Sequence, residues 1–143
     1  MTGEGKIRSE WFGRSVIRSC AKLAYEHAQG MLDEPGRVWR SDELPPVQAP
    51  WTTSHLSEKV AQLQNLAQHL RASREAAGAL RLDQPKLCFT LNPDTGLPDG
   101  YKLHQQKEAN KLIEEFMLLA NMAVAHKLYR WVGYPIVLAL LNV

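Results

Sequence analysis

The stretch EANKLIEEFMLLANMAVAHKLYR, residues 108–130, decides how this chain folds. Its apolar side chains cover most of the circumference of a helix, so we predict a long helix that is buried on nearly all sides. We expect a helix that is buried on nearly all sides to lie at the centre of a larger domain. Four polar residues interrupt its apolar surface: Asn110, Glu114, Glu115 and Asn121.

Three of these polar residues share one stripe of the helix. Asn110, Glu114 and Asn121 recur with Met117 at helical spacing. Burying a carboxylate and two amides is costly, so the stripe either pairs with a neighbouring polar group or faces a wet cleft. Because most buried polar groups are hydrogen-bonded, the residues alone favour the first interpretation, a polar seam between helices.

Shorter elements are predicted in the first third of the chain. Residues 15–23 alternate between polar and apolar side chains, which predicts a strand. Residues 25–32 (YEHAQGML) suit a short helix. Residues 34–53 hold the densest group of prolines in the chain, so we predict a surface connection there.

A second amphipathic helix follows this connection. Ser54 or Ser57 can cap its start, and Gly78 is expected to stop it after about residue 77. Its apolar residues recur at helical spacing: Val60, Leu63, Leu66, Ala67 and Leu70. Arginines in and after it could bind phosphate, although scattered arginines are usually solvated surface: Arg71, Arg74 and Arg81.

A β-hairpin is expected between the two long helices. Residues 79–82 and 86–91 have strand character, and so does the region near 101–105. The intervening NPDTG, residues 92–96, is a strong turn signal. Together the elements predict an α/β fold, more strictly a mixed α+β arrangement.

Composition excludes several classes of protein. The 143 residues suffice for one ordinary domain, and the net charge of +2 lacks the basic excess of an obvious nucleic-acid binder. Cys20, Cys88 and the five histidines show no zinc-binding or triad spacing. No apolar run approaches the roughly 20 residues of a membrane span, and there is no signal peptide, so we expect a cytoplasmic protein without membrane contact.

Three segments in order resemble the RNB domain of the ribonuclease II/ribonuclease R family: WFGRSVIRSCAKLAYEHAQGML, GALRLDQPKLCFTL and NKLIEEFMLLANMAVAHK. The resemblance covers about residues 10–130 and includes ELPP at 43–46 and DTGLP at 94–98. It implies that residues 1–143 form a partial, incomplete RNB domain. The apolar tail at 131–143 departs from the family, and we expect a truncated or alternatively spliced product.

The resemblance implies processive hydrolysis of single-stranded RNA from its 3′ end. In the family, four closely spaced aspartates hold Mg²⁺, or Mn²⁺, in a segment that precedes the matched region. The aspartates of this chain are isolated, so we expect the chain alone to be inactive. A non-catalytic RNA-binding or regulatory fragment is the alternative, followed by a helical interaction module. Similarity to a eukaryotic cytoplasmic branch implies 3′-uridylated RNA as a substrate.

The family's motifs also imply roles for single residues. Tyr25 and Glu114 match a tyrosine and a glutamate that face the ribose, where they can bond the 2′-hydroxyl and distinguish RNA from DNA. Glu115 and Asn121 match the same glutamate-containing motif, but each can instead hold the helix in place. Relatives carry a base-stacking aromatic near Arg81, and the arginine here can stack on a base or hold phosphate.

Overall fold

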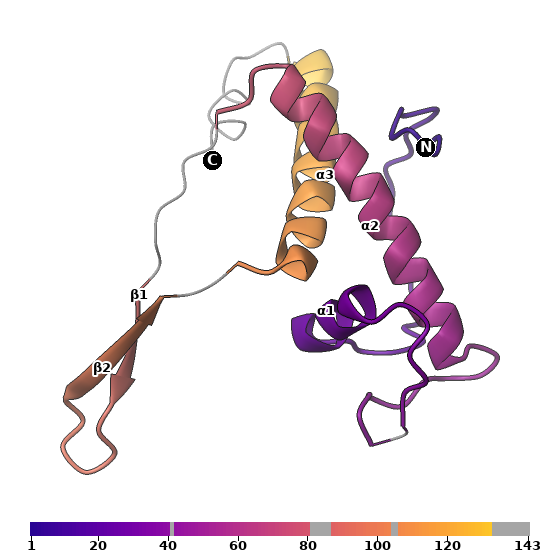
Figure 1. Ribbon diagram of the computed structural model, residues 1–143. Coiled ribbons are helices and arrows are strands. Elements are labelled where there is room, and N and C mark those ends of the chain that lie inside the picture. The colour runs from indigo at the N-terminus through magenta and orange to yellow at the C-terminus, as the bar shows by residue number, and fades with distance from the viewer. Residues whose placement is uncertain (41, 81–86, 104–105, 133–143) are drawn as a thin grey trace.

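The structure is a computed structural model that describes residues 1–40, 42–80, 87–103 and 106–132. Within these residues, three helices and one two-stranded antiparallel sheet follow each other (Figure 1). In order they are α1 (Tyr25–Asp33), α2 (Thr53–Ala76), β1 (Leu87–Leu91), β2 (Pro98–Leu103) and α3 (Glu108–Val132). The predicted mixed α+β class is therefore confirmed, with a hairpin and a long C-terminal helix.

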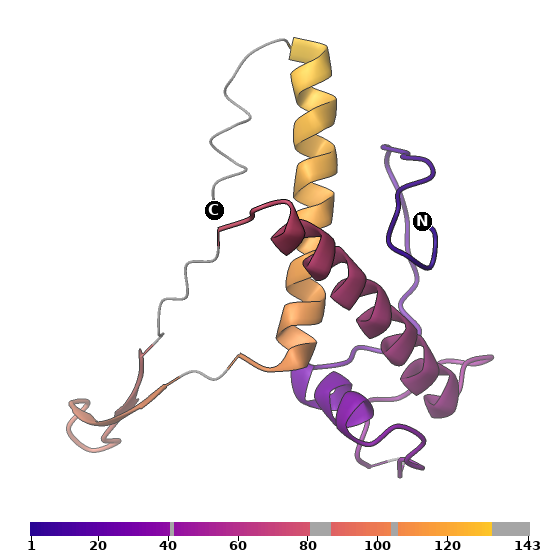
Figure 2. The same ribbon diagram turned by 45° about the horizontal axis from the view of Figure 1, so that its top comes forward.

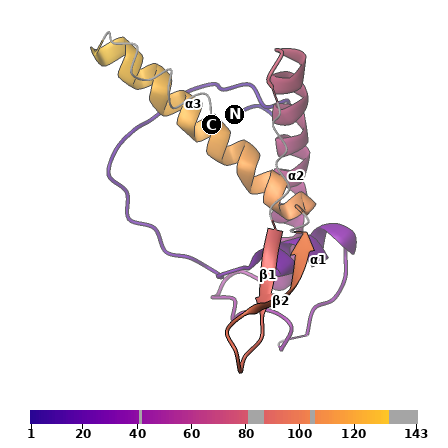
Figure 3. The ribbon, with the colours of Figure 1, turned by 90° about the vertical axis from the view of Figure 1, so that its left-hand side faces the viewer.

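The N-terminal arm, residues 1–24, contains no strand, so the strand predicted at 15–23 is wrong. Val16 and Ile17 are 103% and 84% exposed, and the arm forms no ladder with β1 or β2. Alternation of side chains creates a strand only where a second strand supplies hydrogen bonds. Figure 3 shows the arm as an open loop outside the helices.

Helix α1 confirms the short helix predicted at 25–32 and ends one residue later. Its first turn is closed by the His27 side chain, whose Nδ1 accepts a hydrogen bond from the Ala24 N–H at 3.0 Å. Met31 is almost fully buried at its centre. The Trp39 ring lies so close to Gly30 that a Cβ there would sit 2.7 Å from the indole. The connection therefore folds back onto α1.

Helix α2 confirms the second predicted helix, but its start differs. Thr52 is the N-cap, and its hydroxyl accepts a hydrogen bond from the His55 N–H at 3.3 Å. The predicted caps, Ser54 and Ser57, lie inside the first two turns. At the other end Gly78 takes a φ of +85°, a conformation that glycine adopts at little cost, so the expected stop is confirmed.

The three helices pack against each other in pairs and form the core (Figure 2). The buried apolar residues come from all three helices and from the connection after α1: Met31, Leu44, Ala67, Ala109, Leu112 and Ala125. On α2, Gln64 and Ala67 are buried while Leu63 is 43% exposed. The face of α2 that meets its neighbours is thus more polar than its apolar spacing indicated.

In this chain α3 is buried along one face, so the prediction of burial on nearly all sides is wrong here. Ala109, Leu112, Glu115 and Ala125 are buried. The opposite side leaves large apolar side chains in solvent: Ile113, Met117, Val124, Leu128 and Trp131. Met122 and Tyr129, in the C-terminal half of α3, are exposed as well. Helices α1 and α2 cover one face of α3 only, because two neighbours cannot surround a helix of 25 residues.

The hairpin forms around the predicted turn. Asn92 Oδ1 accepts hydrogen bonds from the backbone N–H groups of Asp94 and Thr95, and Gly96 has a φ of +68°. The second strand begins at Pro98, earlier than predicted, and Ala79 and Leu80 lie outside any strand. The strands contact each other and none of the described helices, as Figure 1 also shows.

In the described part of the chain, none of the helices combines the length and apolar character that crossing a bilayer requires.

Candidate functional site

Two adjacent glutamates on α3 have opposite surroundings. Neighbouring residues of a helix point about 100° apart, so the side chains of Glu114 and Glu115 leave α3 in different directions. Glu115 is only 3% exposed, whereas Glu114 is exposed to solvent. The pair therefore divides into an inward and an outward carboxylate.

The inward carboxylate, Glu115, is held by two arginines of α2. Arg74 donates through Nη2 to Oε1 at 2.6 Å and through Nε to Oε2 at 3.2 Å, and Arg71 Nε donates to Oε1 at 3.4 Å. The hydrogen bond to Glu115 raises the pKa of Arg74 above its ordinary value. Both arginines, which the sequence left as phosphate ligands or solvated surface, are thus paired with this carboxylate.

A second glutamate extends this contact along the two helices. Glu108 accepts hydrogen bonds from Gln64 Nε2 at 3.2 Å and from Lys111 Nζ at 2.8 Å, and Arg71 Nη1 lies 3.7 Å away. The hydrogen bond from Lys111 is the main cause that lowers the pKa of Glu108. The polar seam comprises Gln64, Arg71 and Arg74 of α2 with Glu108 and Glu115 of α3.

The outward carboxylate, Glu114, is held from its own side of the helix. The Gln106 side chain, just before α3, donates through Nε2 to Glu114 Oε2 at 2.7 Å. Asn110, one turn earlier, accepts the Lys107 N–H at 3.1 Å, so the chain entering α3 is folded against this side. Glu114 is therefore held in place while it stays in solvent.

The stripe predicted on α3 faces outward in this chain. Glu114, Met117 and Asn121 are exposed, and Asn110 is half-buried. A polar seam between helices does exist, as the residues favoured, but Glu108 and Glu115 build it. The stripe itself lies in solvent, where Gln106 pairs with its Glu114.

Tyr25, the remaining predicted residue of the ribose site, is the first residue of α1 and is 45% exposed. Helix α1 is tied to the start of α3, because Gln29 Oε1 accepts the Ala109 N–H at 3.0 Å. Tyr25 and Glu114 thus belong to two helices in direct contact. Arg81 lies outside the described residues.

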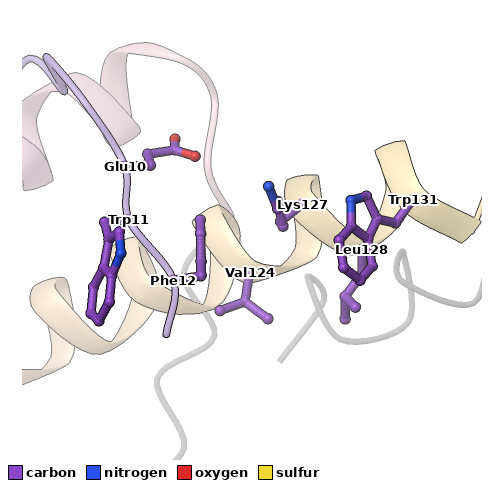
Figure 4. A pocket seen from close by; sticks show the side chains of 7 residues that line it. All are labelled: Glu10, Trp11, Phe12, Val124, Lys127, Leu128 and Trp131. Atoms are coloured by element: carbon purple, nitrogen blue, oxygen red, sulfur yellow. The ribbon is translucent and has the colours of Figure 1, made fainter. Parts of the chain in front are cut away.

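Sequence reasoning did not identify a pocket between the arm and the C-terminal half of α3 (Figure 4). It has a volume of about 480 Å³. Lys127 Nζ lies 5.8 Å from the centre of the Phe12 ring and 5.7 Å from that of Trp131, within cation–π range. Its lining residues are Glu10, Trp11, Phe12, Val124, Lys127, Leu128 and Trp131. No local motif joins these two distant segments.

The carboxylates of the described residues do not fit a catalytic Mg²⁺ ion, which needs several oxygen ligands in octahedral geometry. Asp33 accepts a hydrogen bond from Gln29 at 2.7 Å, and Asp42 lies 3.7 Å from Arg40. Within residues 1–40, 42–80, 87–103 and 106–132, no three His, Cys, Asp or Glu side chains gather as a metal site would require. No catalytic step can be assigned to a metal ion on these residues.

Comparison with known proteins shows which family and which proteins this chain resembles. The family model described as "RNB domain" matches residues 1–140. Over 130 residues the chain is 53% identical to DIS3-like exonuclease 2 of Xenopus tropicalis, and over 128 residues 48% identical to DIS3-like exonuclease 2 of Caenorhabditis elegans. Over 122 residues it is 37% identical to a protein of Arabidopsis thaliana named inactive exonuclease DIS3L2.

These matches cover most of this chain and little of the relatives. They span 91%, 90% and 85% of the chain, but 16%, 15% and 11% of the respective relatives. The segment is similar to relatives named as exonucleases and to one named as inactive. With the family model matching almost every residue, the chain belongs to the RNB-domain family.

Proposed function

We propose that this chain is the RNA-channel segment of a 3′–5′ exoribonuclease that degrades single-stranded RNA. One observation carries the proposal: Glu114 is exposed on the outer side of α3 while the adjacent Glu115 is buried. A carboxylate held in solvent by a neighbouring amide is ready to accept a hydrogen bond from a ligand. Membership of the RNB-domain family supports RNA as that ligand.

Tyr25 and Glu114 are the residues to which we assign ribose recognition. A carboxylate accepts a hydrogen bond from a 2′-hydroxyl, and a phenol donates one to it, so the two groups are chemically complementary to a ribose. Deoxyribose offers neither bond. Hydrogen bonds to charged groups contribute about 1.5 to 3 kcal/mol, which is enough for at least tenfold discrimination.

The other matched residues receive different roles. Asn121 lies on the outer stripe two turns beyond Glu114, about 10 Å further along the helix, so it would contact another part of the RNA. Glu115 is saturated by arginines, and we assign it to holding α3 rather than to RNA. Arg81 is proposed to stack on a base or to hold phosphate.

The whole enzyme's properties are part of the same proposal. Hydrolysis would use Mg²⁺ or Mn²⁺ bound by residues other than those described, because the described carboxylates do not form a metal site. The substrate would be single-stranded RNA with 3′ uridines, in the cytoplasm. The second candidate, a non-catalytic RNA-binding fragment, is favoured for the isolated chain by the same poor fit of its carboxylates to a metal.

Ribose recognition is tested in an active enzyme. Residues 10–130 would replace the matching segment of the Xenopus tropicalis exonuclease, and Glu114→Ala and Tyr25→Phe would be introduced there. We expect each variant to reduce the ratio of cleavage rates on all-ribose and singly deoxy-substituted substrates about tenfold, because one hydrogen bond is lost. Tyr25→Phe keeps the ring and so isolates the hydroxyl.

Matched controls use residues of the same type elsewhere in the described chain. Tyr129→Phe changes an exposed tyrosine on α3, and Glu58→Ala removes an exposed carboxylate of α2 that also accepts a hydrogen bond from an amide, that of Gln62. Both should leave the ratio unchanged. If the Glu114 and Tyr25 variants remain folded and also keep the wild-type ratio, these residues do not read ribose.

Assays of RNA binding and RNA cleavage by the chain itself distinguish the two candidate functions. We expect binding of a 5′-labelled oligouridine, measured by fluorescence anisotropy, without release of mononucleotides in Mg²⁺ or Mn²⁺. Release of nucleotides that a chelator abolishes would show that the chain is itself a nuclease. Absence of binding would favour a helical interaction module instead.

A further inference from the structure

The polar seam has a geometry that can orient a helix. On α3, Glu108 and Glu115 are seven residues apart, and on α2 the same spacing separates Gln64 from Arg71. Seven residues are close to two helical turns, so each helix presents its polar groups along one face. The helices therefore meet at two polar points, one at Glu108 and one at Glu115.

Two contact points restrict α3 more than one would. A single hydrogen-bonded pair leaves a helix free to pivot about it, whereas two pairs a couple of turns apart oppose both rotation and sliding. The apolar residues between these helices are small, with Ala67 and Ala109 almost fully buried. Apolar contacts are non-directional, while charge-assisted hydrogen bonds require a defined geometry. The seam therefore sets the rotation of α3.

Within the seam, Arg74 makes the stronger contact with Glu115. It holds both carboxylate oxygens, whereas Arg71 reaches Glu115 at 3.4 Å and Glu108 at 3.7 Å. Arg71 Nη2 is buried and has no hydrogen-bond partner among the described residues. Arg74 is thus the residue whose loss should free Glu115 most.

From these contacts we infer that Arg74, assisted by Arg71, is a positioning residue for ribose recognition. Arg74 acts through Glu115, because holding that carboxylate fixes the rotation of α3 about its axis. Glu114, the residue before Glu115, takes its direction from the same helix. Any rotation of α3 turns Glu114 by the same angle. The inference rests on the proposed function, in which Glu114 contacts the ribose.

The test compares ribose and deoxyribose binding by the full chain. Affinities for a labelled oligouridine and for the same oligonucleotide with 2′-deoxy residues would be measured for the wild type, Arg74→Met, Arg74→Lys and Glu114→Gln. We expect the wild type to prefer ribose about tenfold and Arg74→Met to prefer it about twofold or less, since a misdirected carboxylate loses one hydrogen bond. Lysine keeps the charge but not the two-oxygen geometry, so Arg74→Lys should restore part of the preference.

Controls separate positioning from loss of fold. Arg37→Met removes an ion pair of similar length, 2.7 Å between Arg37 Nη2 and Glu43 Oε1, within the connection between α1 and α2. It should leave the preference unchanged. Thermal melts of every variant run in parallel, and Glu115→Gln, which conserves shape, replaces Arg74→Met if that variant is unfolded at the assay temperature.

Each outcome decides the inference. A loss of preference in both Arg74→Met and Glu114→Gln, with partial rescue by Arg74→Lys, supports it. If only Glu114→Gln loses the preference, ribose recognition stands and Arg74 is merely structural. If the wild type shows no preference, or Glu114→Gln keeps it, the proposed function itself fails and the positioning role fails with it.

Discussion

The helical cluster and the hairpin are built by different means. Helices α1, α2 and α3 contact each other and share the buried core, whereas β1 and β2 contact only each other. Phe89 and Tyr101 face each other across the hairpin, yet both remain more than 60% exposed. A two-stranded hairpin alone is at best marginally stable in water. Stability of this chain should therefore come from the helices.

The hairpin also has two unlike faces. Phe89 opposite Tyr101 and Leu87 opposite Leu103 form an apolar face, because side chains alternate along a strand. Cys88 and Thr90 lie on the other face. An exposed apolar face with no covering element favours association. The apolar face of the hairpin thus contacts none of the described helices.

The largest loss of stability is expected from the polar seam. Glu115→Ala would leave Arg71 and Arg74 without their shared partner, and breaking a buried ion pair costs about 3 to 5 kcal/mol. Since the two arginines are 17% and 25% exposed, we expect about 3 kcal/mol. Urea denaturation followed by circular dichroism measures it. An unchanged midpoint would show that the seam does not hold the cluster.

A somewhat smaller loss is expected in the apolar core. Met31→Ala removes the largest fully buried side chain of the described residues and should lower the free energy of unfolding by about 2 to 3 kcal/mol. Methionine 122, which is 38% exposed on α3, offers the control. Met122→Ala should cost well under half as much in the same denaturation experiment. Equal costs would mean that the cluster is not packed around α1.

Acid should weaken the helical cluster through Glu108. Its pKa is lowered from the ordinary value of 4.5, so its contribution to stability is complete above that value and is lost as the pH falls through the folded pKa. We expect a melting temperature that falls below about pH 4.5. Glu108→Gln should flatten this fall in part only, because the pKa of Glu43 is also lowered, first by the hydrogen bond from the Arg40 backbone N–H. A steeper fall in the variant would contradict this assignment.

The smallest effect on the helices is expected from the hairpin. Phe89→Lys should change the free energy of unfolding of the helical cluster by no more than about 0.5 kcal/mol, because its side chain touches no helix. Its effect should appear in self-association, which we expect of the wild-type chain because α3 and the hairpin expose large apolar side chains. Sedimentation velocity across a range of concentrations measures it.

Thr90→Lys is the matched control for this experiment. It places the same charge on the opposite face of β1, where Thr90 pairs with Gly100. We expect it to leave self-association as in the wild type. If the wild-type chain is a monomer with a sharp, concentration-independent melt, the apolar surfaces do not drive association.

Much of the local structure was predictable, because its causes lie within a few residues. Helical spacing predicted α2 and α3, the stretch YEHAQGML predicted α1, and Asn92 with Gly96 predicted the turn of the hairpin. The prediction of a strand at 15–23 was wrong because a strand has causes outside its own residues. Alternation is only a local pattern, and a strand depends on a partner that the arm does not have.

The residues of the candidate site were predictable from the sequence only in part. Family motifs in the sequence selected Tyr25, Glu114, Glu115 and Asn121, and left open whether Glu115 contacts RNA or holds its helix. The structure places Glu115 in the polar seam and Glu114 in solvent. Both are glutamates in one apolar helix, so composition and spacing cannot show which of them is buried. Their surroundings depend on α2, which lies about 40 residues earlier in the chain.

The sequence by itself determined the family, the helices and the turn, because motifs, spacing and turn residues act over short distances. Only the tertiary structure decided which carboxylate is buried, which arginines meet it and which face of α3 stays uncovered. Those outcomes follow from how helices rotate against one another, and rotation is set by contacts between segments far apart in the chain. Glu115 beside Arg74 is the clearest case, since neither residue's own neighbourhood predicts the other.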